Sequence, residues 1–144
     1  MAGTDDLARF VDAQASVYGS VVEELRAGRK RSHWMWFVFP QLRGLGHSDM
    51  AWRYGIEDLG EARAFLAHPV LGVRLHECLA LVVAAPGAIE AILGPVDAVK
   101  LRSCVTLFDV AADGDPSARA VLDRWWGGVP DERTLELLGR VPDA

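Results

Sequence analysis

The chain has 144 residues, of which 51% are apolar and 24% charged. This length suits one domain with a buried core and is short for two ordinary domains. The composition excludes a disordered, low-complexity or collagen-like chain, and the formal net charge of -5 excludes a generally basic nucleic-acid-binding protein. We therefore expect a single domain over residues 1–144.

The positive charges are concentrated in one segment. Residues 26–53 contain six basic residues and one acid, which gives +5 and leaves -10 on the rest of the chain. The basic residues are Arg26, Arg29, Lys30, Arg31, Arg43 and Arg53, and the acid is Asp49. Solubility accounts for the total charge but not for this segregation.

Signals for export or membrane insertion are missing from the sequence. The N-terminal residues run into Thr4-Asp5-Asp6 without the apolar stretch of a signal peptide. The longest apolar run, residues 79–85, is far shorter than the roughly 20 residues that span a bilayer. Cys78 and Cys104 lie within apolar helical patterns, which predicts buried thiols. We expect a cytoplasmic protein that makes no membrane contact.

In chain order, apolar residues at helical spacing first predict an amphipathic helix over residues 7–25, capped by Thr4 or Asp5. Residues 27–46 contain three glycines and predict a loop, in which residues 34–39 form either a short strand or a buried turn. Aspartate, proline and glycine signals then bound further helices at 58–67, 69–84, 88–93, a helix capped by Asp97, 115–127 and 130–139. The sum is an all-α, or nearly all-α, bundle of six or seven helices.

Gln14 lies in the middle of the apolar stripe of the first predicted helix, between Phe10 and Tyr18. A buried amide without a partner costs about 1–3 kcal/mol, so Gln14 must form hydrogen bonds. Two interpretations stay open: Gln14 ties down a loop backbone in the core, or Gln14 and Tyr18 form the floor of a polar pocket.

Residues 29–41 combine three consecutive cations and a histidine with four of the twelve aromatic residues. Aromatic rings stack on bases, and cations neutralise phosphates. The segment is therefore either the densest part of the core with solvated cations at its rim, or one wall of a site for a nucleotide-sized anion. The candidate ligand-binding residues here are Arg31, His33, Trp34, Trp36 and Gln41.

Two other stretches carry weaker signals. Gly44 and Gly46 form a small-residue loop whose amides can approach a phosphate, and Ser48 suits either that loop or the cap of a following helix. Lys100 and Ser103 flank an apolar helix face, where they either meet a ligand or are exposed to solvent. The four histidines are not at metal-ligand spacings and no standard catalytic motif occurs, so we expect neither a metal nor a cofactor.

Several motifs resemble a bacterial and fungal family of unknown function, DUF1810, which is sometimes mislabelled calpastatin. They are Phe10-x-x-Ala13-Gln14, Ser32-His33-Trp34-Met35-Trp36-Phe37-x-Phe39-Pro40-Gln41-Leu42, Gly44-Leu45-Gly46-x-Ser48, and Lys100-Leu101-x-Ser103-Cys104. The resemblance covers nearly the whole chain and implies a compact helical domain. The calpastatin label has no physical support, because such an inhibitor segment is disordered and this composition is that of a folding chain.

A weaker similarity, carried by Phe10-x-x-Ala13-Gln14, Lys100-Leu101, Trp126-Gly127 and Leu138-Gly139-Arg140, is to NADAR-type proteins that process ADP-ribose. It implies an N-glycosidic bond between ribose and a base or amide as the substrate. The acidic residue of that family has no clear counterpart in this sequence.

These observations lead to one hypothesis and one alternative. We expect a pocket for a small phosphate-bearing ligand, nucleotide-like or ADP-ribose-like, with Asp49 as the candidate carboxylate for hydrolysis of its N-glycosidic bond. The alternative is a non-catalytic interaction module whose basic, aromatic face binds a protein or nucleic-acid partner, or a second copy of the chain. A concave pocket containing Gln14, His33, Trp36 and Lys100 favours the first, and a flat exposed face favours the second.

Overall fold

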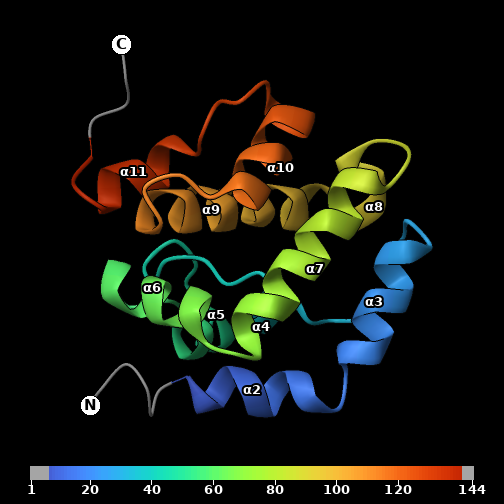
Figure 1. The fold of residues 1–144 in the computed structure, drawn as a ribbon, viewed down its shortest axis with the longest axis horizontal. Coiled ribbons are helices and arrows are strands. Elements are labelled where there is room, and N and C mark those ends of the chain that lie inside the picture. Colours follow the sequence, from blue (N-terminus) through green and yellow to red (C-terminus); the bar gives the residue numbers. More distant parts are fainter. Residues whose placement is uncertain (1–6, 141–144) are drawn as a thin grey trace.

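The computed structural model describes residues 7–140 and contains ten helices within them (Figure 1). They are α2 (Ala8–Ala15), α3 (Tyr18–Arg26), α4 (Met35–Val38), α5 (Asp49–Tyr54), α6 (Leu59–Ala67), α7 (Leu71–Ala84), α8 (Ile89–Leu93), α9 (Pro95–Ala111), α10 (Pro116–Trp126) and α11 (Glu132–Leu137). Extended pairing among the described residues is limited to one parallel bridge between Leu42 and Ile56. The all-α class is confirmed.

The helix count of six or seven is too low, for two local reasons. The helix expected over residues 7–25 is interrupted after Ala15, where the Val17 N–H donates to the Gln14 carbonyl at 3.1 Å, and it continues as α3. The expected count also leaves out two short helices. Residues 35–38, within the expected loop, form the single helical turn α4, which agrees with the buried turn and not with the strand, and α5 follows Ser48, where a helix cap is one of the two interpretations.

Four helix starts are built as expected, by a side-chain oxygen that accepts from the backbone N–H three residues later. The acceptors are Ser48 for α5, Asp58 for α6, Asp115 for α10 and Asp131 for α11. The prediction that Asp97 caps α9 is wrong: α9 begins at Pro95 after Gly94, and Asp97 lies in its first turn. Thr4 and Asp5, expected to cap the first helix, lie outside the described residues.

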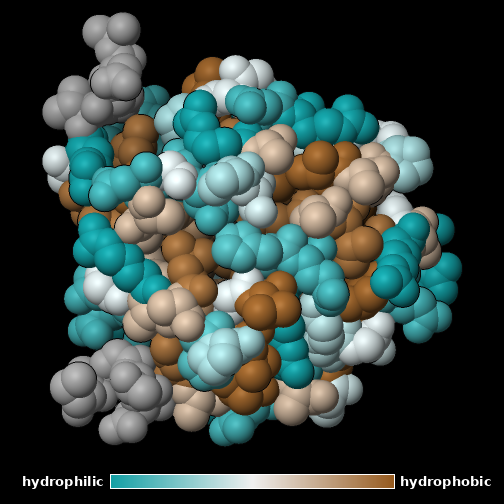
Figure 2. Space-filling model, viewed as in Figure 1, coloured by the Kyte–Doolittle hydropathy of each residue, from teal (hydrophilic) through white to brown (hydrophobic). Residues whose placement is uncertain are grey.

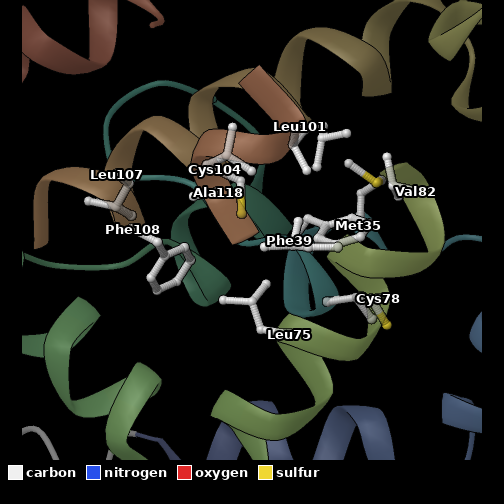
Figure 3. Packing of buried hydrophobic residues seen from close by; sticks show 14 of the residues in the cluster. Met35, Phe39, Leu75, Cys78, Val82, Leu101, Cys104, Leu107, Phe108 and Ala118 are labelled. Atoms are coloured by element: carbon white, nitrogen blue, oxygen red, sulfur yellow. The ribbon is translucent and has the colours of Figure 1, made fainter. Parts of the chain in front are cut away.

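The long helix α9 lies at the centre and packs against α6, α8, α10 and α11, while α7 crosses beside it and contacts α3, α6 and α10 (Figure 1). Figure 3 shows how α4 enters this arrangement, because Met35 and Phe39 at its two ends lie between α7 and α9. Both cysteines are buried free thiols within the same core, as expected.

The face drawn in Figure 2 is a mixture of polar and apolar side chains, with apolar side chains gathered beside α7 and α10. In the described part of the chain, no single helix is both long and apolar enough to cross a bilayer. Only α6 and α7 taken together reach that length and apolar content, and the pair is bent by 87°.

Candidate functional site

Within residues 29–39, most of the aromatic side chains are buried, whereas Arg29, Arg31 and His33 are exposed. Trp34 and Phe39 are each 1% exposed and pack edge-on at 5.9 Å between ring centroids, whereas Arg31 and His33 are exposed. Trp34 therefore belongs to the core and offers no free ring face, which corrects its assignment as a stacking residue. Trp36 is only half-buried, so its ring is the one aromatic surface that α4 presents at the molecular surface.

The loop before α4 is held in place by one carboxylate. Glu24 of α3 accepts hydrogen bonds from the Arg31 N–H at 2.6 Å, the Ser32 N–H at 3.0 Å, the Ser32 hydroxyl at 2.6 Å and the Trp34 indole N–H at 3.1 Å. Burial raises the pKa of Glu24, but these donors outweigh it and lower the pKa to about 2. The Arg31 side chain is consequently displayed by a fixed backbone.

Gln14 and Tyr18 do not form the floor of a pocket. Gln14 is 2% exposed, and its amide donates to the Phe37 carbonyl at 2.7 Å while accepting from Arg74 at 3.3 Å. Tyr18 donates to Glu77 on α7, and burial together with this bond raises the pKa of its phenol above the usual range. The structure agrees with the first interpretation, in which Gln14 ties a loop backbone into the core.

An open groove of about 590 Å³ lies where the segment after α4 meets α9 and the start of α11. We call it the α9 groove. It is lined by Gln41, Leu45, Gly46, His47, Pro95, Val96, Val99, Lys100, Ser103, Asp131 and Arg133. Four of the predicted ligand-binding residues, Gln41, Gly46, Lys100 and Ser103, are therefore brought together from two distant stretches of the chain.

Trp36 joins this set through Lys100. The Lys100 ammonium lies 5.6 Å from the centroid of the Trp36 ring, within range of a cation–π contact. A narrow cleft beside the groove is lined by both residues and shares Gln41 and Lys100 with it. Trp36 therefore lines the neighbouring cleft and not the groove itself, and it contacts the groove lysine from that side.

The polar groups of the groove differ in how far they are engaged. Lys100 is 29% exposed and lies 3.7 Å from Asp97. Ser103 is 3% exposed, and its hydroxyl donates to the Val99 carbonyl, so this group bonds the helix backbone. The Asp131 carboxylate accepts both the N–H and the hydroxyl of Thr134, at 2.9 and 2.6 Å. Lys100 and the exposed Arg133 are the cations that face this concavity.

The remaining predicted site residues lie outside the lining of the groove. They are Gln14, Tyr18, Arg31, His33, Trp34, Gly44, Ser48 and Asp49. Ser48 caps α5, and Asp49 is an exposed residue in the first turn of that helix. Gly44 adopts a φ of +109°, which favours glycine for backbone reasons alone. The pocket expected to contain Gln14, His33, Trp36 and Lys100 together is not formed.

No motif singles out Arg133, Val96 and Val99, which complete the groove. Val96 and Val99 are 68% and 61% exposed. Their spacing of three residues on α9 places them on one face, which was the available sequence signal. Arg133 comes next to the groove because Asp131 starts α11 there.

The comparison with known proteins rests on one family model, described as "Protein of unknown function (DUF1810)", which matches residues 4–138. The chain belongs to the DUF1810 family. The resemblance seen in the motif over residues 32–42 is thereby confirmed. The family description names no activity.

A solved structure supports the same conclusion at the level of the fold. The crystal structure of the conserved hypothetical protein Rv1873 from Mycobacterium tuberculosis, at 1.38 Å, is 59% identical in sequence to this chain and has a TM-score of 0.91. The match covers 94% of this chain and 98% of that one. No curated protein matches the chain.

Proposed function

We propose that the protein binds a small organic anion, with a phosphate group next to an apolar or planar part, in the α9 groove. The observation that carries the proposal is the placement of Lys100 and Arg133 around a concave surface lined by exposed apolar residues. Ligand sites are typically concave and mainly apolar, with a few polar groups that fix orientation.

The two kinds of surface in the groove suit the two parts of such a ligand. Leu45, Pro95, Val96 and Val99 offer apolar contact. Lys100 and Arg133 oppose the single carboxylate of Asp131, so the lining carries a net charge of +1 in a chain of net charge -5. Guanidinium and ammonium groups bind phosphate through charge-assisted hydrogen bonds. A nucleotide-like or ADP-ribose-like molecule has the matching chemistry.

The proposal is restricted to binding. Cleavage of an N-glycosidic bond requires a carboxylate or an equivalent group beside the scissile bond. Among the described residues, the carboxylate that lines the groove is that of Asp131, and it already accepts two hydrogen bonds from Thr134. Turnover of ADP-ribosylated compounds, followed by mass, would add catalysis to the proposal, and its survival in Asp49→Asn would remove Asp49 as the acid.

The test is a thermal-shift and calorimetric titration with AMP, ADP-ribose and pyrophosphate, with adenosine as the uncharged comparison. We expect the phosphate-bearing compounds to raise the melting temperature and adenosine to have little effect. Lys100→Met and Arg133→Met each remove one charge-assisted contact, worth about 1.5 kcal/mol, and weaken binding about tenfold. Because binding is electrostatic, affinity falls as salt is added.

The matched control is Arg26→Met, which removes an exposed cation from α3, outside the groove lining. It is expected to leave the affinity unchanged. The proposal is wrong if no compound binds at millimolar concentration, or if Lys100→Met and Arg133→Met bind as tightly as the wild type.

A second candidate function rests on Arg29, Arg31 and His33, which are exposed on the loop that Glu24 fixes. A rigid cationic loop suits the phosphate backbone of a nucleic acid, and the burial of Trp34 leaves no neighbouring ring for base stacking. Fluorescence anisotropy with a labelled single strand tests it. Loss of binding in Arg29→Glu/Arg31→Glu, with Lys100→Met unaffected, assigns binding to the loop and not to the groove.

A further inference from the structure

The basic loop and the α9 groove are connected by one carboxylate. Asp97 on α9 lies 3.1 Å from the Lys30 ammonium through one oxygen and 3.7 Å from the Lys100 ammonium through the other. Lys30 comes from the loop after α3 and does not line the groove. The three side chains carry a net charge of +1.

Lys30 is firmly held where it meets Asp97. Its side chain is 9% exposed, its ammonium lies 5.2 Å from the centroid of the Trp34 ring, and its backbone N–H donates to the Ile92 carbonyl at 2.8 Å. Lys100 is the more exposed and more distant of the two lysines. Asp97 therefore pairs mainly with Lys30. The Lys100 ammonium is only weakly paired and remains available to an anion in the groove.

Removal of the Lys30 charge changes this balance. Asp97 is then left with Lys100 as its one cationic partner among the described residues, and the attraction draws Lys100 away from an anion in the groove. Removal of the Asp97 charge has the opposite effect, because Lys100 then has no carboxylate partner within residues 7–140.

We propose that Lys30 and Asp97 are positioning residues that set the affinity of the α9 groove for anions through Lys100. The proposal rests on the proposed function, since it takes Lys100 as a ligand-binding group. It extends that function to Lys30, a residue of the basic segment that does not line the groove, and it makes the charge of Lys30 a determinant of binding affinity.

The experiment is a calorimetric titration of the full chain with inorganic pyrophosphate as the probe. Removing one unit charge from Lys30 or Asp97, in a partly exposed site, is expected to change the dissociation constant about fivefold. We expect Lys30→Met to weaken binding about fivefold, Asp97→Asn to strengthen it about fivefold, and Lys30→Arg, which keeps the charge, to restore wild-type affinity. Circular dichroism checks that each variant is folded, and Lys30→Gln carries the same expectation as Lys30→Met.

A double variant distinguishes two ways in which Lys30 can affect binding. In the first, called the relay, Lys30 acts on Lys100 through Asp97, and in the second the charge of Lys30 acts directly on the anion. In the Asp97→Asn background, the relay predicts that Lys30→Met no longer alters affinity. If the two substitutions act additively, or if Lys30→Met has no effect alone, the relay is wrong while the proposed function stands. If neither the wild type nor Asp97→Asn binds pyrophosphate, the proposed phosphate site itself is wrong, and the inference fails with it.

Discussion

The side-chain amide of Gln14 donates a hydrogen bond to the main-chain carbonyl of Phe37 at 2.7 Å. This bond joins α2 to α4 inside the core and gives a partner to a carbonyl that would otherwise be buried without one. It also removes Gln14 from the set of groups that meet a ligand. Gln41, the other glutamine of the chain, lines the α9 groove and is half-exposed.

The two glutamines are expected to respond to substitution in opposite ways. Gln14→Leu leaves the Phe37 carbonyl unpaired, so the free energy of unfolding falls by about 1–3 kcal/mol, while the affinity of the groove is unchanged in the folded protein. Gln41→Leu alters stability by no more than about 0.5 kcal/mol and weakens anion binding. Urea unfolding and calorimetry measure the two effects. Equal effects of the two variants on stability would contradict the assignment.

The four hydrogen bonds that Glu24 accepts from residues 31–34, which we call the Glu24 clamp, predict that stability depends on pH in the acid range. The pKa of Glu24 falls from 4.5 to about 2 on folding, so its contribution is fully present above 4.5 and is lost as the pH falls toward 2. We expect Glu24→Gln to lower the melting temperature at neutral pH and to match the wild type near the acid limit. Glu23→Gln, an exposed neighbour on α3, is the control with little effect at any pH. A difference between wild type and Glu24→Gln that is constant with pH would disprove the clamp.

The contact between α6 and α7 depends on a glycine. A Cβ atom at Gly72 would lie 2.1 Å from the Leu66 carbonyl oxygen, whereas one at Gly19 on α3 would meet nothing within 4 Å. Gly72→Ala is therefore expected to cost about 1–3 kcal/mol or more, because the two helices must separate. Gly19→Ala should stabilise the protein by about 0.5–1 kcal/mol through helix propensity. Thermal unfolding distinguishes them, and a tolerated Gly72→Ala would show that the helix pair is not closely packed.

The two thiols are expected to be unreactive in the folded protein. Burial raises the pKa of Cys78 to about 12 and the pKa of Cys104 well above its usual range. Neither should be modified by a thiol reagent at about pH 8, and both should react once the chain is unfolded. Because the unfolded thiol ionises near 9.0 and the folded one does not, stability is full below that pH and falls above it. Mass spectrometry of the labelled protein gives the number of modified thiols. Rapid labelling of the native protein would contradict the prediction that both thiols are unreactive.

The local chemistry of the sequence was enough to predict the helical class and several helix starts. Asp58, Asp115 and Asp131 cap the helices that their spacing indicated, because a cap is a contact between residues three apart. The short helix α4 was not predictable in the same way. An apolar run of six residues fits a buried strand and a buried helical turn equally well, and only its packing between α7 and α9 selects the turn.

The candidate site shows the same division. The sequence alone determined that cations and aromatic residues are concentrated between residues 26 and 53, and that the chain resembles the DUF1810 family. The tertiary structure decided that Trp34 is buried, that Gln14 is a core residue, and that Lys100, Gln41 and Arg133 line one groove. These placements bring together segments far apart in the chain, and they are decided by the packing of whole helices, which no local pattern encodes.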